Sequence, residues 1–310
     1  MEARDMKRMS VLIIVGLSLL LGACATTNER DYAARWARSA PEFLRLDNGM
    51  TVRYVRSGEG PPLVLLHTIR TQLDYFEKLV PELKGRYRVY ALDLPGHGRS
   101  SLQSGNYTEP FLREAVGEFI TKLDLSDVTL VGESIGGVLA LTVSVDQADR
   151  VRRVVSLNPY DYGESFGGGI RRSSNGWMVG MFQVFGSYTF EPRFVTAAVL
   201  RGGFHDAAQL PEELLDEFSR AGSRDGYRSV EYSVFKNWSS WLEARQLYSK
   251  VKVPVTLIYG SDDWSRPEER NRNREAIPGS ELFTIDQAGH FTSLERPAEV
   301  AQLILSRRAN

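Results

Sequence analysis

The chain has almost no cysteine and little histidine. Cys24 is the only cysteine, and the 310 residues include four histidines. One thiol cannot form an internal disulfide or a cysteine cluster for a metal ion. The formal net charge is only −1, which gives no reason to expect nucleic acid as a partner. The composition is that of an ordinary globular protein, with no internal repeat and no sign of a second core.

The N-terminus carries an apolar segment that is shorter than a typical transmembrane helix. Arg4, Lys7 and Arg8 precede an apolar run over residues 11–21, and small residues follow it. A transmembrane helix needs about 20 apolar residues. A basic start, a short apolar run and small residues are the layout of a secretory signal peptide. We therefore expect residues 1–23 to be a cleaved signal peptide.

The end of this segment, Leu21-Gly22-Ala23-Cys24, resembles the lipobox of bacterial lipoproteins. The resemblance implies cleavage before Cys24, a lipid on its thiol and attachment to a membrane, with residues 24–42 as lipidated cysteine and tether. It also implies a place in the bacterial cell envelope, on the periplasmic side. Ala25 favours the outer membrane if the cell is Gram-negative. The alternative is an ordinary signal peptide or N-terminal anchor with an incidental cysteine.

Strand-like and helix-like segments alternate along the rest of the chain. Apolar, β-branched runs predict strands over 51–56, 63–67, 87–92, 128–131, 151–157, 253–259 and 281–285. Helical spacing of apolar residues predicts helices over 73–83, 111–123, 134–145, 268–276 and 297–307. This alternation predicts an α/β protein with a mostly parallel sheet and helices on both faces.

The alternation stops over residues 159–245, a stretch rich in glycine and aromatic residues. One amphipathic helix is predicted there, over 211–221, with Pro211 in its first turn. The alternation then resumes. We interpret 159–245 as an insertion between two parts of one core, 43–158 and 246–310, and not as a separate domain in series.

A candidate nucleophile lies between the predicted strand 128–131 and the helix that follows. In Gly132-Glu133-Ser134-Ile135-Gly136, glycine stands two residues to each side of the serine. A sharp strand-to-helix turn strains the central residue and needs small neighbours so that strand and helix can approach. The serine hydroxyl would then be exposed at the carboxyl edge of the sheet. We expect Ser134 to be the nucleophile.

A serine nucleophile needs a base, and the base needs an acid. Of the four histidines, only His290 lies on a loop after a late strand, at the edge where Ser134 is expected. Two adjacent carboxylates, Asp262 and Asp263, follow the predicted strand 253–259. We favour Asp263 as the acid, with Asp262 next and Asp161 third.

These residues together resemble the α/β-hydrolase superfamily from about residue 43 onward. The chain order Ser134, Asp263, His290 is the family's order of nucleophile, acid and base. The run from Asp93 to Ser100, DLPGHGRS, and the Gly289-His290 pair match further family motifs. The G-x-x-D pattern at residues 260–263 selects Asp263. The resemblance also implies a helical cap between strands six and seven.

One motif departs from the family. Where His-Gly is common after the third strand, this chain has His67-Thr68-Ile69. The resemblance implies that the backbone N–H groups of Ile69 and Ile135 form the oxyanion hole. Thr68 places a side chain where glycine is usual, which would narrow the pocket or add a hydroxyl group.

The expected activity is hydrolysis of a small-molecule ester, with an apolar acyl or alcohol part, through an acyl-enzyme on Ser134. Other activities open to the same triad are C–C bond hydrolysis, perhydrolysis and acyl transfer. A serine nucleophile argues against relatives that use aspartate, such as epoxide hydrolases. No metal or organic cofactor is implied. A different class of protein, a lipid-anchored binding protein on a hydrolase fold without catalysis, is the remaining alternative.

Overall fold

The computed structural model describes residues 31–164, 166, 168–173, 176–185 and 191–306. The predicted signal peptide, Cys24 and most of the predicted tether lie outside these residues. One compact unit runs from Tyr32 to Asn310. Within the described ranges, no helix combines the length and apolar character needed to cross a bilayer.

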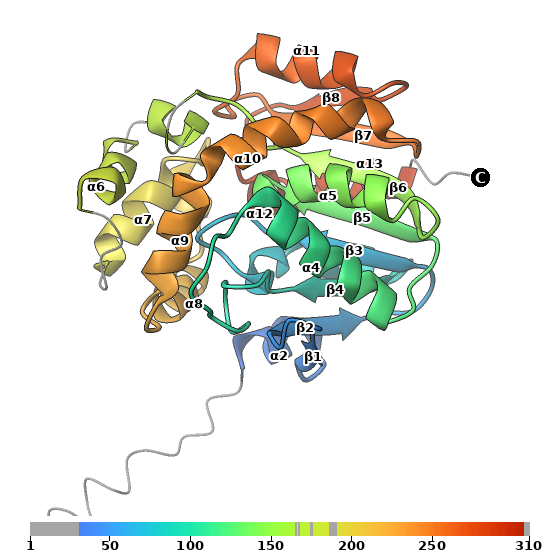
Figure 1. The fold of residues 1–310 in the computed structure, drawn as a ribbon, viewed down its shortest axis with the longest axis horizontal. Helices are drawn as coiled ribbons and strands as arrows, with labels where there is room; N and C mark the ends of the chain where they lie inside the picture. The colour runs from blue at the N-terminus through green and yellow to red at the C-terminus, as the bar shows by residue number, and fades with distance from the viewer. Residues whose placement is uncertain (1–30, 165, 167, 174–175, 186–190, 307–310) are drawn as a thin grey trace, which may run out of the picture. The chain divides into compact units, whose positions relative to one another are not determined.

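Eight strands form a single sheet at the centre of the unit (Figure 1). They are β1 Glu42–Arg45, β2 Thr51–Ser57, β3 Pro62–Leu66, β4 Arg88–Leu92, β5 Val128–Glu133, β6 Val151–Leu157, β7 Val255–Gly260 and β8 Glu281–Ile285. Their order is β1-β2-β4-β3-β5-β6-β7-β8. The pairs β1–β2 and β2–β4 are antiparallel and all the others are parallel. The predicted mostly parallel sheet is confirmed.

Helices cover both faces of the sheet, as predicted. On one face, α4 Glu109–Lys122 and α5 Ile135–Asp146 contribute to the larger apolar core. On the other, α3 Leu79–Leu83 and α13 Pro297–Ser306 contribute to a second core. Strand β3 shows how one sequence serves both: Val64 and Leu66 belong to the first core, Leu63 and Leu65 to the second. Alternate residues of a strand point to opposite faces, so a strand buried on both sides is apolar throughout.

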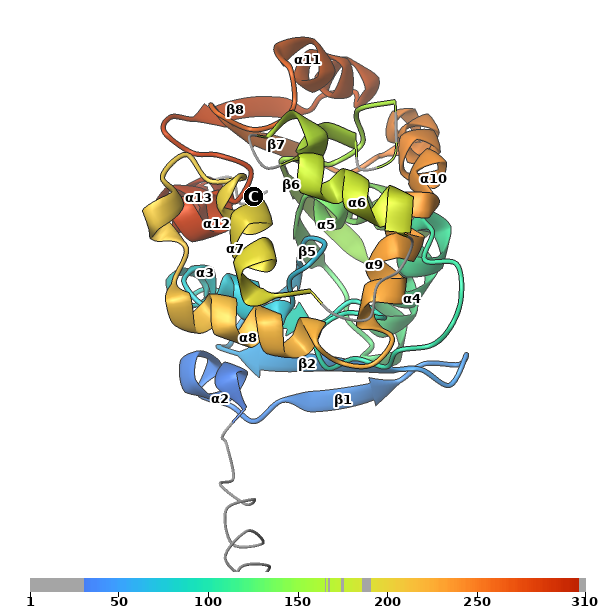
Figure 2. The same cartoon turned by 90° about the vertical axis from the view of Figure 1, so that its left-hand side faces the viewer.

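A helical cap connects β6 to β7, which confirms the predicted insertion. Its elements are η2 Gly168–Arg172, α6 Trp177–Phe185, α7 Arg193–Arg201, η3 Ala207–Gln209, α8 Glu212–Gly222, α9 Tyr227–Lys236, α10 Trp238–Glu243 and η4 Ala244–Lys250. Figure 2 looks onto this cap, with α6, α7 and α8 toward the viewer. The predicted amphipathic helix is α8, but Pro211 precedes its first turn as the N-cap residue and does not lie within it.

The start of the folded unit differs from the expectation. Residues 32–37 form α2, and β1 begins at Glu42, within the segment interpreted as a tether to residue 42. Ala33 and Ala37 of α2 are buried, and the Trp36 indole N–H donates to Asp74 Oδ1 at 2.9 Å. Six residues with little periodicity give no helix signal of their own, because so short a helix depends on tertiary contacts.

The predicted helix 73–83 is also divided. A short 3₁₀ helix, η1 Leu73–Phe76, precedes α3 Leu79–Leu83. Pro81 explains the break. In one continuous helix its ring would clash with the carbonyl of residue 77, and its missing N–H would leave that carbonyl without a donor. Restarting at Leu79 places Pro81 in a first turn, where it is tolerated.

Asp74, which accepts the hydrogen bond from Trp36 of α2, should make the stability of the protein depend on pH. Burial raises the pKa of Asp74 to about 7, against attraction from Arg53. The unfolded value is about 3.9, so the native state binds the proton more tightly. The contribution of Asp74 to stability is therefore fully present below about pH 4 and is lost as the pH rises through about 7. Asp74→Asn should remove this fall. It should raise the free energy of unfolding at about pH 8.5, by on the order of 4 kcal/mol, and so raise Tm there but not near pH 4.

Thermal melts followed by circular dichroism at the two pH values measure this effect. Asp225→Asn, at an exposed aspartate, is the matched control and should change Tm little at either pH. An equal shift of the Asp74→Asn variant at both pH values would contradict the assignment.

Candidate active site

Ser134 lies at the sharp turn between β5 and α5. Its backbone has φ 62° and ψ −120°, a strained conformation for a residue with a side chain. A Cβ atom on Gly132 would lie 1.9 Å from the carbonyl oxygen of Gly136, and one on Gly136 would lie 2.1 Å from that of Leu66. Both contacts are sterically impossible, which gives the physical reason for glycine at these two positions. The turn has the predicted geometry of a nucleophile elbow.

Glu133, the residue before the serine, holds the turn between β5 and α5 in place through its side chain. Glu133 is buried, and its carboxylate accepts hydrogen bonds from Tyr75 Oη (2.8 Å), Thr292 Oγ1 (2.6 Å) and the Ser293 N–H (3.2 Å). Thr292 and Ser293 directly follow His290 and Phe291 in the chain. The carboxylate therefore links the elbow to the loop that carries the predicted base. The sequence alone indicates no role for Glu133, because nothing in it marks this contact between segments far apart.

The predicted acid and base are in direct contact. His290 Nδ1 lies 2.5 Å from Asp263 Oδ1, and both side chains are buried. Asp263 Oδ2 accepts the Ser265 N–H at 2.9 Å and also the Ser265 hydroxyl. Burial opposes ionisation, but the attraction of His290 and the hydrogen bonds from Ser265 hold the pKa of Asp263 below its ordinary value. A carboxylate here fixes the histidine tautomer with the proton on Nδ1, which leaves Nε2 as the base.

The other two candidate acids lie elsewhere. Asp262 is exposed and faces His205, with Oδ2 at 2.8 Å from His205 Nδ1. Asp161 is buried and accepts hydrogen bonds from Tyr248 Oη at 2.6 Å and from Asn273. Of the three carboxylates, the structure places only Asp263 against His290.

The predicted nucleophile and base atoms are both buried, and no hydrogen bond joins one to the other. Ser134 Oγ and His290 Nε2 are buried, and neither has a hydrogen-bond partner among the described residues. Other buried atoms nearby, Thr68 Oγ1 and Ser293 Oγ, are also without a partner among the described residues. An unpaired hydroxyl and an unpaired imidazole nitrogen are the groups that nucleophilic catalysis uses.

The predicted oxyanion loop is held by its backbone. The Thr68 carbonyl accepts hydrogen bonds from His67 Nδ1 at 2.7 Å and Thr71 Oγ1 at 2.8 Å. His67 Nε2 accepts the Leu94 N–H at 2.9 Å, so its proton is on Nδ1. In a trans peptide the N–H of the next residue points opposite to the carbonyl. Anchoring this carbonyl therefore sets the direction of the Ile69 N–H.

The second predicted donor, Ile135, is the first residue of α5, where backbone N–H groups have no partner inside the helix. Thr68 itself is buried, and its hydroxyl oxygen has no partner among the described residues. Thus the side chain that replaces the usual glycine adds a free hydroxyl group to this loop. The roles of Ile69 and Ile135 stay predictions.

Trp264 is a site residue without a predicted role. Its ring stacks on His290 with 4.0 Å between ring centroids and 18° between the planes. The indole N–H donates to the Gly202 carbonyl at 3.1 Å, which fixes the ring. If His290 acts as the predicted base, the imidazolium that it forms would lie against this aromatic face, which stabilises a cation. The only sequence signal was its place directly after Asp263.

Replacing Trp264 by leucine should lower kcat about tenfold, because the imidazolium loses its aromatic neighbour. Trp264→Phe keeps a ring and should retain most of the rate. Steady-state kinetics with a soluble ester measure both variants. Equal rates for the leucine and phenylalanine variants would show that the ring does not stabilise the cation.

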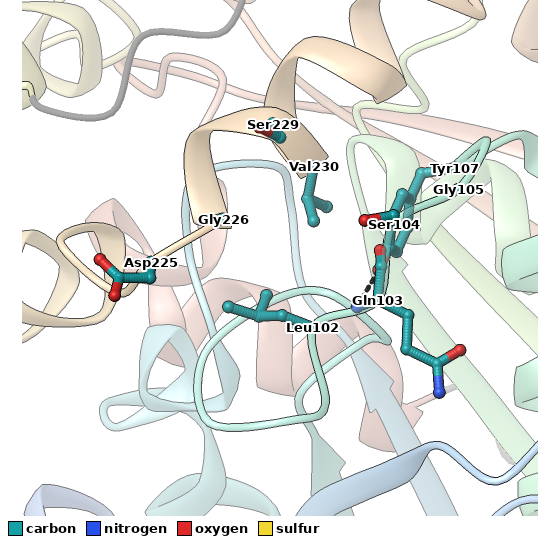
Figure 3. Close-up of a pocket in the computed structure, with 9 residues that line it drawn as sticks. All are labelled: Leu102, Gln103, Ser104, Gly105, Tyr107, Asp225, Gly226, Ser229 and Val230. Carbon is teal, nitrogen blue, oxygen red and sulfur yellow. Dashed lines mark hydrogen bonds between the residues drawn. The ribbon is translucent and has the colours of Figure 1, made fainter.

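A separate pocket of about 340 Å³ lies where the cap meets the core (Figure 3). Leu102, Ser104 and Tyr107 line it from the loop after β4, and Gly226 and Val230 from α9 and the residue before it. None of the three triad residues lines this pocket. It therefore marks the junction of cap and core, and not the site of the chemistry. Across the described residues, no group of three or more His, Cys, Asp or Glu is placed to hold a metal ion.

Comparison with known proteins agrees with this fold. A family model described as the alpha/beta hydrolase fold matches residues 61–297. The chain therefore belongs to the α/β-hydrolase family, and it is a hydrolase of that family.

Individual relatives differ in their substrates. The chain is 27% identical to the uncharacterized hydrolase YugF of Bacillus subtilis, over 78% of this chain and 88% of that protein. It is 25% identical to a pimeloyl-[acyl-carrier protein] methyl ester esterase of Neisseria meningitidis, over 77% of this chain and 74% of the esterase. A bacterial membrane phospholipase A superposes with a TM-score of 0.74 at 20% identity, over 99% of this chain and 100% of the phospholipase. That likeness shows the fold alone. The chain is also 25% identical to bifunctional epoxide hydrolase 2 of Rattus norvegicus, over 85% of this chain and 54% of that protein. A meta-cleavage product hydrolase has a similar fold, with a TM-score of 0.71.

Proposed function

We propose that the protein hydrolyses a carboxylic ester with an apolar acyl or alcohol part, through an acyl-enzyme on Ser134. One observation carries the proposal: the contact of Asp263 with His290 leaves His290 Nε2 unpaired at the edge where the Ser134 hydroxyl is also unpaired. The serine also separates the chain from epoxide hydrolases that use aspartate.

The reaction has two halves. His290 Nε2 takes the hydroxyl proton while Ser134 Oγ attacks the ester carbonyl, and the electron pair moves to the carbonyl oxygen. The N–H groups of Ile69 and Ile135 stabilise that oxyanion. The intermediate collapses, the C–O bond breaks, and the alcohol leaves with the proton from His290. Water then repeats the sequence on the acyl-enzyme and releases the acid.

The surroundings of His290 support an apolar substrate. The Tyr160 ring lies 5.6 Å from that of His290 and 4.6 Å from that of Trp238, centroid to centroid. Trp264 covers another side of the imidazole. Some cap aromatics only pack against each other, as Phe166 does with Phe235. A relative with an ester substrate, the pimeloyl-[acyl-carrier protein] methyl ester esterase, agrees with the proposal.

A panel of esters with increasing acyl length, assayed with a chain that begins at Ala25, tests the activity. We expect kcat/KM to rise with acyl length over the first members of the panel. A vinylogous diketone tests C–C bond hydrolysis, peracid formation tests perhydrolysis, and added alcohols test acyl transfer. Turnover of one of these without ester hydrolysis would replace the proposal. No turnover at all would favour the non-catalytic binding protein.

We also propose that Cys24 carries a lipid that holds the protein at a membrane of the bacterial envelope. The support is the run Leu21-Gly22-Ala23-Cys24 after a basic and apolar leader. Mass spectrometry of the mature N-terminus should find diacylglycerol on Cys24 as the first residue. An unmodified Cys24 within a longer chain would contradict this. Fractionation of the two membranes tests the preference for the outer one that Ala25 indicates.

A further inference from the structure

The cap exposes large apolar side chains on two neighbouring helices. On α6, Trp177, Val184 and Phe185 are 64%, 75% and 72% exposed, and on α7 Phe194 is 69% exposed. The two helices contact each other, and both lie toward the viewer in Figure 2. We call these four side chains the cap patch. Exposed apolar side chains gathered on one region of a protein mark an interaction surface.

Helix α6 is apolar on its exposed side as well as on its buried side. Its sequence, WMVGMFQVF, has one polar residue, Gln183. Val179 is fully buried and belongs to the larger core, while the two residues at its end, Val184 and Phe185, face outward. A helix on the surface of a globular protein normally presents polar residues to water. An apolar helix at a surface therefore needs an apolar environment on its outer side.

We propose that the cap patch docks on the surface of a lipid bilayer. A tryptophan at one end of α6 and a phenylalanine at the other suit the boundary between headgroups and acyl chains. Arg171, just before α6, is exposed, and its described hydrogen bond goes to the uncharged Gln183 at 3.4 Å. Its positive charge is therefore available to lipid phosphate groups, as a basic residue beside an interfacial helix usually is.

The proposed lipid on Cys24 would attach the chain to a bilayer. Residues 25–31 separate Cys24 from α2, and a chain of that length reaches at most about 25 Å. A lipidated Cys24 would thus keep the folded unit close to the membrane. At that distance, even weak docking of the cap patch is strengthened by the high local concentration of lipid.

Docking would bring the catalytic residues near the membrane. The loop that follows α7 contacts them directly: the His290 N–H donates to the Gly203 carbonyl at 2.6 Å, and Trp264 donates to Gly202. The helix with Phe194 therefore ends beside the base.

Vesicle flotation tests docking without help from the anchor. The protein is a chain that begins at Ala25, which has no lipid and keeps the whole compact unit from Tyr32. It carries Ser134→Ala, so that the vesicles are not hydrolysed. With vesicles of phosphatidylcholine and a minority of phosphatidylglycerol, we expect it to float. Replacing Trp177 and Phe185 by serine should weaken binding at least about tenfold.

Phe43 provides a matched control. It is 60% exposed, but it lies on β1 and not on the cap. Phe43→Ser removes a comparable side chain and should leave flotation unchanged. Circular dichroism melts of the variants should coincide, because the substituted side chains are exposed. In a second readout, brominated lipids should quench tryptophan fluorescence of the parent and much less that of Trp177→Phe.

Three results would overturn the proposal. The parent chain does not float, or the cap and Phe43 variants float equally. Alternatively, the protein does not bind vesicles but forms a concentration-dependent dimer that the cap variant disrupts. The cap patch would then bind a second copy of the chain. Activity is scored separately, with soluble esters and an intact Ser134. Ester turnover without flotation rejects docking alone, and flotation without turnover rejects the proposed hydrolysis alone.

Discussion

Replacing Ser134 by alanine is expected to lower kcat by roughly 10⁵-fold or more and to abolish labelling by a fluorophosphonate probe. The alanine keeps the strained elbow backbone, with φ 62° at residue 134, but removes the hydroxyl that attacks the ester. His290 then has no proton to accept from the protein. Gel-based probe labelling and ester kinetics measure the two effects independently.

Ser144→Ala is the matched control for this variant. Ser144 is a buried serine on α5, the helix that follows Ser134, and its hydroxyl donates to the Leu141 carbonyl at 2.7 Å. Its loss should reduce stability slightly and leave labelling intact. Labelling of the Ser134→Ala chain at the level of the parent would disprove the serine-hydrolase mechanism.

The second large effect separates two adjacent carboxylates. Asp263→Asn should lower kcat about 10⁴-fold, because a neutral amide cannot stabilise the imidazolium and its NH₂ group favours the wrong tautomer of His290. Asp262→Asn should change kcat by less than about threefold, because Asp262 contacts His205 at the surface and not the base. Both variants carry the same chemical change one residue apart. Ester kinetics with a soluble substrate compare them.

A larger loss for Asp262→Asn than for Asp263→Asn would reverse the assignment. Unlike the serine variant, Asp263→Asn should still react with the fluorophosphonate, but more slowly. This variant keeps the Ser134 hydroxyl and loses only the carboxylate that orients His290. The labelling rate therefore distinguishes an acid that orients His290 from a residue needed only for folding.

Much of the fold was predictable because its signals are local. The strands buried on both faces, such as β3, are continuous apolar runs, and α4 shows helical spacing of its apolar residues. The exceptions are elements whose stability comes from distant contacts. Burial of Ala33 and Ala37 and the hydrogen bond from Trp36 to Asp74 stabilise the helix α2. Residues 32–37 alone give no sign of these contacts. The cap helices α7 and α9 were not predicted, although both are amphipathic, as the burial of Val230 and Val234 on α9 shows.

For the site, the kinds of residue and their order could be predicted, but their surroundings could not. Three motifs, each placed after a strand of a parallel sheet, must bring Ser134, Asp263 and His290 to one edge. Nothing in the motifs indicates that Trp264 stacks on His290. The buried Glu133 contacts Tyr75, Asn158 and Thr292, which lie between 25 and 159 positions away in the chain.

The sequence by itself determined the parallel α/β core, the insertion and the serine, because periodicity, spacing and steric need for glycine act over a few residues. The tertiary structure decided which carboxylate faces His290 and which aromatic ring covers it. It also decided that Trp177 and Phe185 face outward on the cap. Such outcomes depend on which side of each element another element covers, and only the folded chain brings those elements together.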